Sequence, residues 1–113
     1  MKPIEILVVE DNQTMRLGIV ENLKREGYPV RDFENGEDAW KDFQKKATAL
    51  VITDLKMQPI DGMELLQRIK NFRPESEVLM ISAFGTIEVA VKAMQVGAAD
   101  FITKPFSAEE LRI

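Results

Sequence analysis

The sequence contains no cysteine and no histidine among its 113 residues. Without cysteine the chain has no disulfide, no thiolate nucleophile and no cysteine-ligated zinc. Without histidine it has no imidazole metal ligand and no serine–histidine catalytic pair, and it cannot itself carry a phosphohistidine. Any chemistry of this chain must therefore use carboxylates, hydroxyls, lysine and backbone groups.

Clustered basic residues and long apolar runs are also missing. The net charge is −4, and no basic run is longer than a pair such as Lys45-Lys46, whereas nucleic-acid binders need clustered positive charge. No segment approaches the roughly 20 apolar residues of a membrane span, and Met1–Glu5 lacks the apolar stretch of a signal peptide. We therefore predict a cytoplasmic domain that makes no direct contact with nucleic acid or membrane.

Short apolar runs alternate with helical patterns along the chain, whose length fits a single domain. Strands are expected at residues 4–9, 30–33, 50–53, 78–82 and 101–103. Helices are expected at residues 14–26, 37–46 and around 63–69, and from the N-cap Thr86 to Val96, with Gly27 and Gly97 as stop signals. Near-continuous apolar strands that alternate with helices predict a parallel sheet covered on both faces.

The end of the chain predicts a fifth helix. Ser107-Ala108-Glu109-Glu110 resembles a capping box, and the sequence stops at Ile113, about two turns into that helix. We therefore expect residues 1–113 to form one domain that is truncated within its fifth helix.

Three of the expected strands end at charged residues. Glu10 and Asp11 follow the first strand, Asp54 follows the third and Lys104 follows the fifth. Because the carboxyl ends of parallel strands meet at one edge of the sheet, where open α/β folds bind ligands, we expect these side chains to gather there. Three acids and a lysine at such an edge suggest a divalent cation and a phosphoryl group held side by side.

Asp54 is the strongest candidate for chemistry, as a carboxylate nucleophile that forms an acyl phosphate, although a helix cap or loop acid is the commoner role for a single aspartate after a strand. Placing Glu10 or Asp11 near Asp54 would accumulate like charge. Mg²⁺ resolves that conflict because it prefers oxygen ligands. On this interpretation Asp11 and Asp54 bind the ion directly and Glu10 acts through water; alternatively, Asp11 or Asn12 caps the following helix and Glu10 is solvated.

Lys104, Ser82 and Phe101 are further candidates, each with an ordinary alternative. Lys104 offers a compact positive charge to a phosphoryl oxygen, or is an exposed lysine over the sheet edge. Pro105 restricts Lys104 to extended geometry, and a cis bond between them would aim the side chain. Ser82 either donates a hydrogen bond to the phosphoryl group or caps a loop. Phe101 is either a core aromatic or a rotamer switch that moves inward when Ser82 shifts.

The motifs around these residues resemble the receiver domain of two-component response regulators. The matching segments are Val8–Asn12, Ile52–Met57, Pro59–Met63, Ile81–Ala83 and Lys104–Phe106. Their order and spacing make the match highly specific, and it covers essentially the whole chain. Residues 82–86 and 98–101 are most like receivers of the NtrC type, which usually precede an ATPase domain that activates sigma-54 transcription and a helix-turn-helix domain.

The resemblance implies a flavodoxin-like, doubly wound sheet of five parallel strands in the order 2-1-3-4-5. It implies that Asp54 accepts a phosphoryl group from the phosphohistidine of a partner histidine kinase or phosphotransfer protein, and that Ser82 and Lys104 contact that group. By the same resemblance, Mg²⁺ is held by Glu10, Asp11, Asp54 and the backbone carbonyl of Lys56.

Two positions depart mildly from the family pattern. Glutamate stands at position 10, where aspartate is common, and this variant is expected to tolerate magnesium. Phe101 occupies the position of the switch aromatic, which is often tyrosine. Because Phe101 lacks a hydroxyl, its switch is expected to work by packing alone.

The predicted function is a phosphorylation-operated signalling switch rather than an enzyme. It would change a partner or homodimer surface formed by the helix ending at Val96, the strand at 101–103 and the helix from Ser107, and regulate transcription through a separate output domain.

Three other classes fit less well. A haloacid-dehalogenase-like phosphohydrolase needs an acid two residues after its nucleophile, where this chain has Lys56. A flavodoxin-like cofactor binder needs a hydroxyl- and glycine-rich loop where Glu10–Gln13 stands. The intact set of acids argues against a degenerate receiver that acts only in docking.

Overall fold

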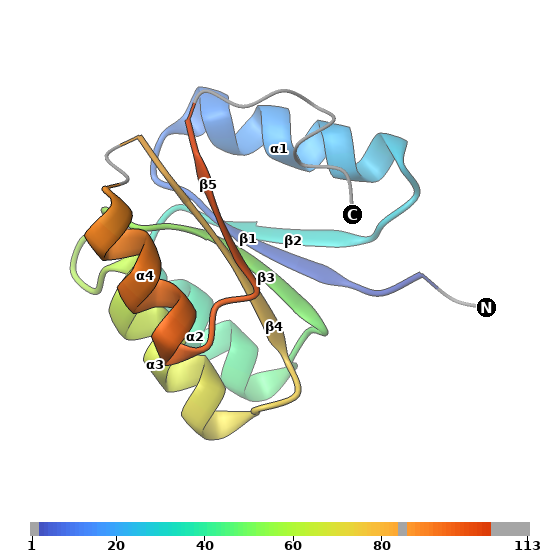
Figure 1. Ribbon diagram of the computed structural model, residues 1–113. Helices are drawn as coiled ribbons and strands as arrows, with labels where there is room; N and C mark the ends of the chain where they lie inside the picture. The colour runs from blue at the N-terminus through green and yellow to red at the C-terminus, as the bar shows by residue number, and fades with distance from the viewer. Residues whose placement is uncertain (1–2, 84–85, 105–113) are drawn as a thin grey trace.

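The computed structural model describes residues 3–83 and 86–104 (Figure 1). Its centre is a five-stranded sheet in the order β2-β1-β3-β4-β5, with every neighbouring pair parallel. The strands are β1 (Ile6–Val9), β2 (Val30–Phe33), β3 (Leu50–Asp54), β4 (Glu77–Ser82) and β5 (Asp100–Thr103). The helices are α1 (Gln13–Arg25), α2 (Gly36–Lys45), α3 (Gly62–Phe72) and α4 (Ile87–Val96). The predicted fold class and strand order are confirmed.

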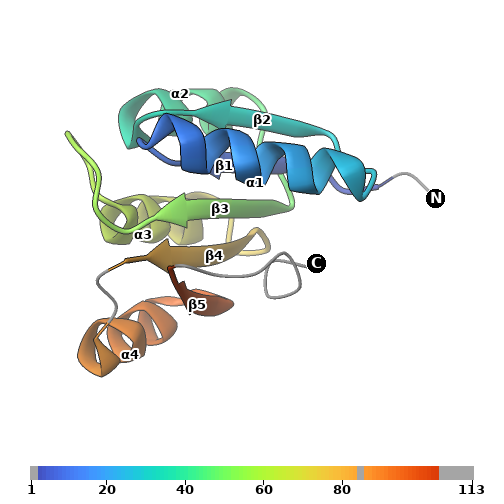
Figure 2. The same ribbon diagram turned by 90° about the horizontal axis from the view of Figure 1, so that it is seen from above.

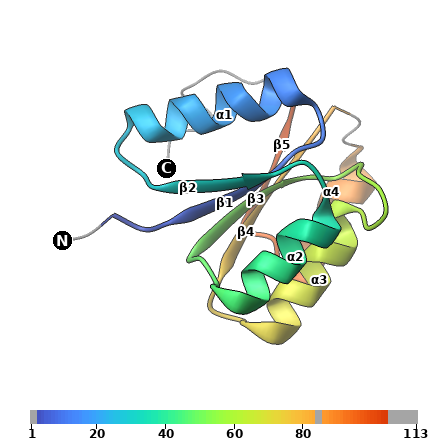
Figure 3. The ribbon, with the colours of Figure 1, turned by 180° about the vertical axis from the view of Figure 1, so that it is seen from behind.

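Helices cover both faces of the sheet, with α1 on one face and α2, α3 and α4 on the other (Figures 1, 2 and 3). Successive residues of β1 divide between two hydrophobic cores, because strand side chains alternate between faces. Ile6 and Val8 join the core under α1, whereas Leu7 and Val9 join the core under the other helices. All four are fully buried, so a continuous apolar run is what this inner strand requires.

Each described helix starts at a polar cap. Asn12, Asn35, Asp61 and Thr86 each accept a hydrogen bond from the backbone N–H three residues further along, which satisfies a donor that the helix itself leaves unpaired. The predicted cap at Thr86 is therefore confirmed. Of the two alternatives at the start of α1, the structure selects Asn12.

Glycines end two of these helices as the sequence predicts. Gly27 and Gly97 follow α1 and α4 with φ of 97° and 122°, backbone angles that glycine adopts without the steric cost that other residues meet.

The first strand is shorter than expected, beginning at Ile6 instead of Ile4. Ladder pairing with both neighbouring strands starts at Ile6, and Ile4 is 41% exposed.

Some predictions concern residues beyond the described ranges. The fifth helix with its capping box at Ser107–Glu110, the truncation within that helix and the Lys104–Pro105 bond all lie there. Among the described residues a cis peptide bond occurs at Gln58–Pro59. No helix in the described part of the chain is long and apolar enough to cross a membrane.

Candidate functional site

The charged residues predicted to meet at one sheet edge do so. Glu10 follows β1, Asp54 ends β3 and Lys104 follows β5. In the parallel register Val9 pairs with Thr53, and Asp54 pairs with Ile81, so these strands end at nearly the same level. The carboxyl edge of the sheet therefore carries the candidate site.

Three carboxylates form a compact acidic cluster at this edge. One carboxylate oxygen from each of Glu10, Asp11 and Asp54 lies within 4.8 Å of the others. Glu10 is fully buried and Asp54 is 6% exposed, while Asp11 is exposed to solvent. Hard oxygen donors at this spacing match the ligands of small divalent cations such as Mg²⁺. The cluster could hold such a metal ion.

Lys104 enters the cluster from β5. Its Nζ lies 2.6 Å from Glu10 Oε1 and 3.5 Å from Asp54 Oδ1. Its backbone N–H donates to the carbonyl of Ser82 at 2.8 Å, which fixes the position from which the side chain departs. Only 13% of the side chain is exposed, so the alternative of an exposed lysine over the sheet edge is wrong.

The surroundings of Glu10 shift its pKa strongly. Burial raises its pKa from 4.5 to about 7, and the neighbouring carboxylates of Asp11 and Asp54 act in the same direction. Hydrogen bonds from Lys104 and from the backbone N–H of Asn12, which lies 3.1 Å from Oε2, act in the opposite direction. The alternative of a solvated Glu10 is wrong, since no part of this residue is exposed.

Asp54 presents its carboxylate to the cluster and does not cap a helix. Its Oδ1 accepts a hydrogen bond from the N–H of Leu55 at 2.9 Å, while Thr53 Oγ1 donates to the Asp54 backbone carbonyl at 3.0 Å. The cap of the next helix is Asp61, seven positions further along the chain. The side chain of Asp54 is therefore held close to Lys104 and to the other two acids.

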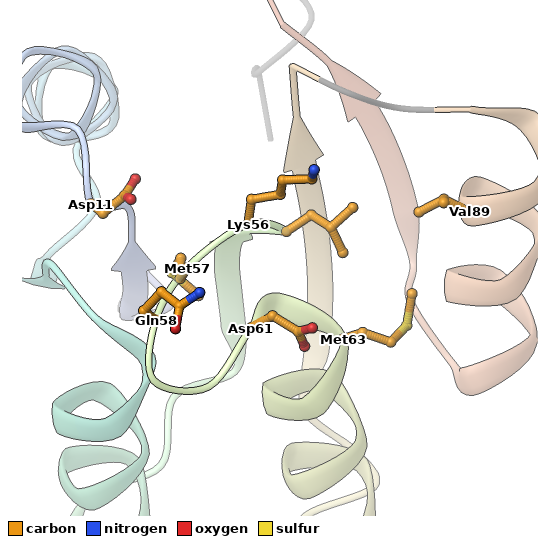
Figure 4. Close-up of a pocket in the computed structure, with 8 residues that line it drawn as sticks. Asp11, Lys56, Met57, Gln58, Asp61, Met63 and Val89 are labelled. Atoms are coloured by element: carbon orange, nitrogen blue, oxygen red, sulfur yellow. The ribbon is translucent and has the colours of Figure 1, made fainter.

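A pocket of about 490 Å³ opens beside the acidic cluster. Its lining residues come from the end of β1, the loop after β3, the start of α3 and α4: Asp11, Leu55, Lys56, Met57, Gln58, Asp61, Met63 and Val89. Figure 4 shows Asp11 on one side of the loop that carries Lys56 and Gln58, and Val89 of α4 on the other. The pocket brings Asp11 and Lys56, two of the predicted metal ligands, onto one surface.

Ser82 and Phe101 occupy the neighbouring strands. Ser82 ends β4, is 1% exposed and pairs with Thr103 in the register. Phe101 is half-buried on β5 and packs against the core under α2, α3 and α4. The structure therefore places Ser82 at the edge with the acids, and it gives Phe101 a core contact; the phosphoryl contact of Ser82 and the switch of Phe101 stay predictions.

Arg16 supports the site although the sequence analysis did not single it out. Its Nη1 donates to the backbone carbonyl of Glu10 at 2.8 Å, and its Nε pairs with Asp32 Oδ2 at 3.1 Å. These contacts tie α1 to the ends of β1 and β2. An arginine in the first turn of a helix gives no signal of this contact, because the contact depends on how α1 lies across the sheet.

The chain thus has a doubly wound parallel α/β fold, a class of domain that binds its ligands at the carboxyl edge of the sheet, and here that edge carries a carboxylate cluster and a lysine. Residues 6–113 match the family described as response regulator receiver domain. The chain belongs to this family, which confirms the resemblance inferred from its motifs.

Relatives of known sequence narrow the type of receiver. A putative response regulator NtrX-like of Rickettsia felis is 39% identical over 115 residues, covering 100% of this chain and 24% of that protein. The DNA-binding transcriptional regulator NtrC of Rhizobium meliloti is 39% identical over 106 residues, covering 94% of this chain and 22% of that protein. The chain thus spans about a quarter of the length of these relatives, and the predicted likeness to NtrC-type receivers is confirmed.

A solved receiver-domain structure has the same fold as this chain. The receiver domain of NtrX from Brucella abortus superposes with a TM-score of 0.89 at 40% identity, covering 95% of this chain and 91% of that one.

Proposed function

We propose that this domain is a phosphorylation-operated switch in which Asp54 accepts a phosphoryl group from a histidine kinase or phosphotransfer protein. The observation that carries the proposal is the position of the Asp54 carboxylate, which has an oxygen within 4.8 Å of the carboxylates of Glu10 and Asp11 and lies 3.5 Å from the ammonium of Lys104. Because the sequence of this domain has no histidine, the phosphohistidine must lie outside the domain. The domain would act in the cytoplasm as a regulatory part and not as an enzyme that turns over an external substrate.

Mg²⁺ is the proposed cofactor, because hard carboxylate oxygens predominate in the cluster. Asp11 and Asp54 would hold it directly with the backbone carbonyl of Lys56, and Glu10 would act through water. When bound, the ion supplies positive charge to the phosphoryl oxygens and to the crowded carboxylates. Burial and the neighbouring carboxylates of Asp11 and Asp54 raise the pKa of Glu10, and a bound cation would offset this crowding of like charge.

The proposed transfer forms one bond and breaks another. An oxygen of Asp54 bonds to phosphorus while the bond between phosphorus and the donor imidazole nitrogen breaks, and the imidazole leaves with that electron pair. Lys104 stands 3.5 Å from Asp54 Oδ1, where its ammonium can neutralise charge on the transferred group. The product is an acyl phosphate that adds charge and hydrogen-bond acceptors at the sheet edge.

The switch is proposed to act through the elements next to the acyl phosphate. Ser82 would donate a hydrogen bond to the phosphoryl group, and Phe101 would repack on β5. This change would pass to the face of α4 and β5, where the apolar side chains of Ile87, Val91 and Met94 are 84%, 49% and 46% exposed. A second copy of the domain is the proposed partner of this face.

The longer relatives named as transcriptional regulators support an output function in transcription.

Labelling by a small phosphodonor tests the proposal. With Mg²⁺ and acetyl phosphate, the wild-type chain should incorporate phosphate and Asp54→Asn should not. Asp38→Asn is the matched control, since Asp38 is an exposed acid of α2. Undiminished labelling of Asp54→Asn would refute the assignment of Asp54.

A further inference from the structure

Two glycines lie against the loop that follows Asp54, here called the acceptor loop (residues 55–61). Gly62 begins α3, and its N–H donates to the carbonyl of Leu55 at 2.7 Å. A Cβ on Gly62 would lie 2.2 Å from the backbone oxygen of Asp54 and 2.9 Å from Leu55 Cα, whereas real Cβ atoms essentially never come within 3.0 Å of another group. Gly62 thus closes the acceptor loop against the backbone of Asp54 itself.

Gly36, the first residue of α2, meets the other end of the acceptor loop. A Cβ there would lie 2.7 Å from Ile60 Cγ1 and 3.0 Å from the Ile60 carbonyl oxygen. Gly36 is not among the positive-φ glycines of the described residues, which are Gly27 and Gly97. Alanine is also the better helix former, by up to about 1 kcal/mol. What opposes a side chain at Gly36 is therefore space alone, and the space is taken by Ile60.

The side chain of Ile60 has no room to move outward into solvent. It is 6% exposed and belongs to the core under α2, α3 and α4, as does Met57, which is 5% exposed. Between these two anchors Gln58 and Pro59 are exposed, and Lys56 directly precedes Met57. Because Ile60 and Met57 pack in the same core, a displacement of Ile60 also shifts the short segment that leads to Met57 and to the adjoining backbone of Lys56, since close packing transmits strain.

We propose that Gly36 is a positioning residue for the metal site. Because Gly36 has no side chain, the start of α2 can pack directly against Ile60. This contact fixes the position of the Lys56 carbonyl relative to Asp11. Lys56 and Asp11 line the same pocket (Figure 4). The inference rests on the proposed function, in which that carbonyl is a ligand of Mg²⁺. Mg²⁺ demands near-ideal octahedral geometry, whereas Ca²⁺ accepts longer and irregular coordination. A displaced carbonyl therefore penalises Mg²⁺ more than Ca²⁺.

The test compares Gly36→Ala with Gly18→Ala in the full chain. Gly18 lies inside α1, where an added Cβ meets nothing within 4 Å, so this variant controls for the glycine-to-alanine change itself. The dissociation constants of Mg²⁺ and of Ca²⁺ are measured separately by calorimetric titration. We expect Gly36→Ala to bind Mg²⁺ about tenfold more weakly, the size of effect typical of groups that orient a metal ligand. Its Ca²⁺ affinity should change less, and Gly18→Ala should match the wild type.

Each outcome decides a separate claim. Unchanged Mg²⁺ affinity in folded Gly36→Ala overturns the positioning role, and so does an equal loss for both ions, which a merely structural defect would produce. Wild-type protein that fails to bind Mg²⁺ contradicts the proposed function instead. If Gly36→Ala does not fold, Ile60→Val loosens the same contact from the other side. It should lower the ratio of Mg²⁺ to Ca²⁺ affinity, and an unaltered ratio overturns the proposal.

Discussion

Lys104 pairs more closely with Glu10 than with Asp54. Its Nζ lies 2.6 Å from Glu10 Oε1 but 3.5 Å from Asp54 Oδ1, and Glu10 and Lys104 are separated by 94 positions in the sequence. The ammonium is therefore held by a fully buried carboxylate before any phosphoryl group arrives. On the proposed mechanism, phosphorylation of Asp54 offers Lys104 a more highly charged partner and draws it away from Glu10.

Removing the ammonium should destabilise the domain in a pH-dependent way. In Lys104→Met the buried carboxylate of Glu10 loses its ion pair, so the free energy of unfolding at pH 8 in EDTA should fall by about 2 kcal/mol. At pH 5 the loss should be smaller, because Glu10, with a pKa of about 7, is then mostly protonated. Urea unfolding measures both values. Lys92→Met, at an exposed position of α4, should change little, and a larger loss at pH 5 than at pH 8 would contradict the pairing.

The raised pKa of Glu10 makes a prediction for the metal-free wild type. A pKa of about 7 in the folded state against 4.5 unfolded means that the folded state binds this proton more tightly. Its contribution to stability is therefore fully present below pH 4.5 and is lost as the pH rises through 7, by about 3 kcal/mol in total. Urea unfolding in EDTA, measured at a series of pH values, should show this decline in the free energy of unfolding in addition to the effects of the other titrating groups.

Glu10→Gln isolates the contribution of this group, because glutamine does not titrate. The unfolding free energy of the wild type minus that of Glu10→Gln should fall as the pH rises from 4.5 to 7. Saturating Mg²⁺ should reduce the shift, since the ion favours ionised carboxylates. A difference that stays constant over this pH range would show that Glu10 titrates normally.

Asp11 should determine magnesium affinity without determining stability. It is the exposed member of the acidic cluster, so Asp11→Asn removes a charged ligand and leaves the core unaltered. We expect Mg²⁺ affinity to fall at least about tenfold, with the unfolding free energy in EDTA unchanged within about 0.5 kcal/mol. Asp61→Asn is the control, because Asp61 lines the same pocket and asparagine caps a helix equally well. Equal losses in the two variants would mean that Asp11 is not a ligand.

Much of the fold could be predicted from the sequence because its local signals agree. The apolar runs match strands buried on both faces, and the polar caps and terminal glycines mark the helices closely. The site followed from the same reasoning, since residues after parallel strands must share an edge. The role of the Lys56 carbonyl came from the family resemblance alone, and it remains a prediction, as do the roles of Ser82 and Phe101.

Other features could not be predicted, because they depend on distances across the fold. A glutamate beside an aspartate after a strand gives no sign that Glu10 is buried and Asp11 exposed. That difference follows from the inner position of β1 in the sheet and from the approach of Lys104, which follows β5. The sequence also gives no signal of the contact between Gly36 and Ile60, because this contact joins the start of one helix to the loop before the next. Nor does a proline reveal that the Gln58–Pro59 bond is cis.

Mapping of the modified residue by mass spectrometry would show whether Asp54 is the phosphoacceptor. Wild-type protein is treated with acetyl phosphate and Mg²⁺, the acyl phosphate is trapped by borohydride reduction, and the modified residue is located in the peptide that contains Asp54. We expect modification at Asp54 alone, and none when EDTA replaces Mg²⁺. Modification centred on another acid, such as Asp11, or labelling at Asp54 that is undiminished in EDTA would contradict it.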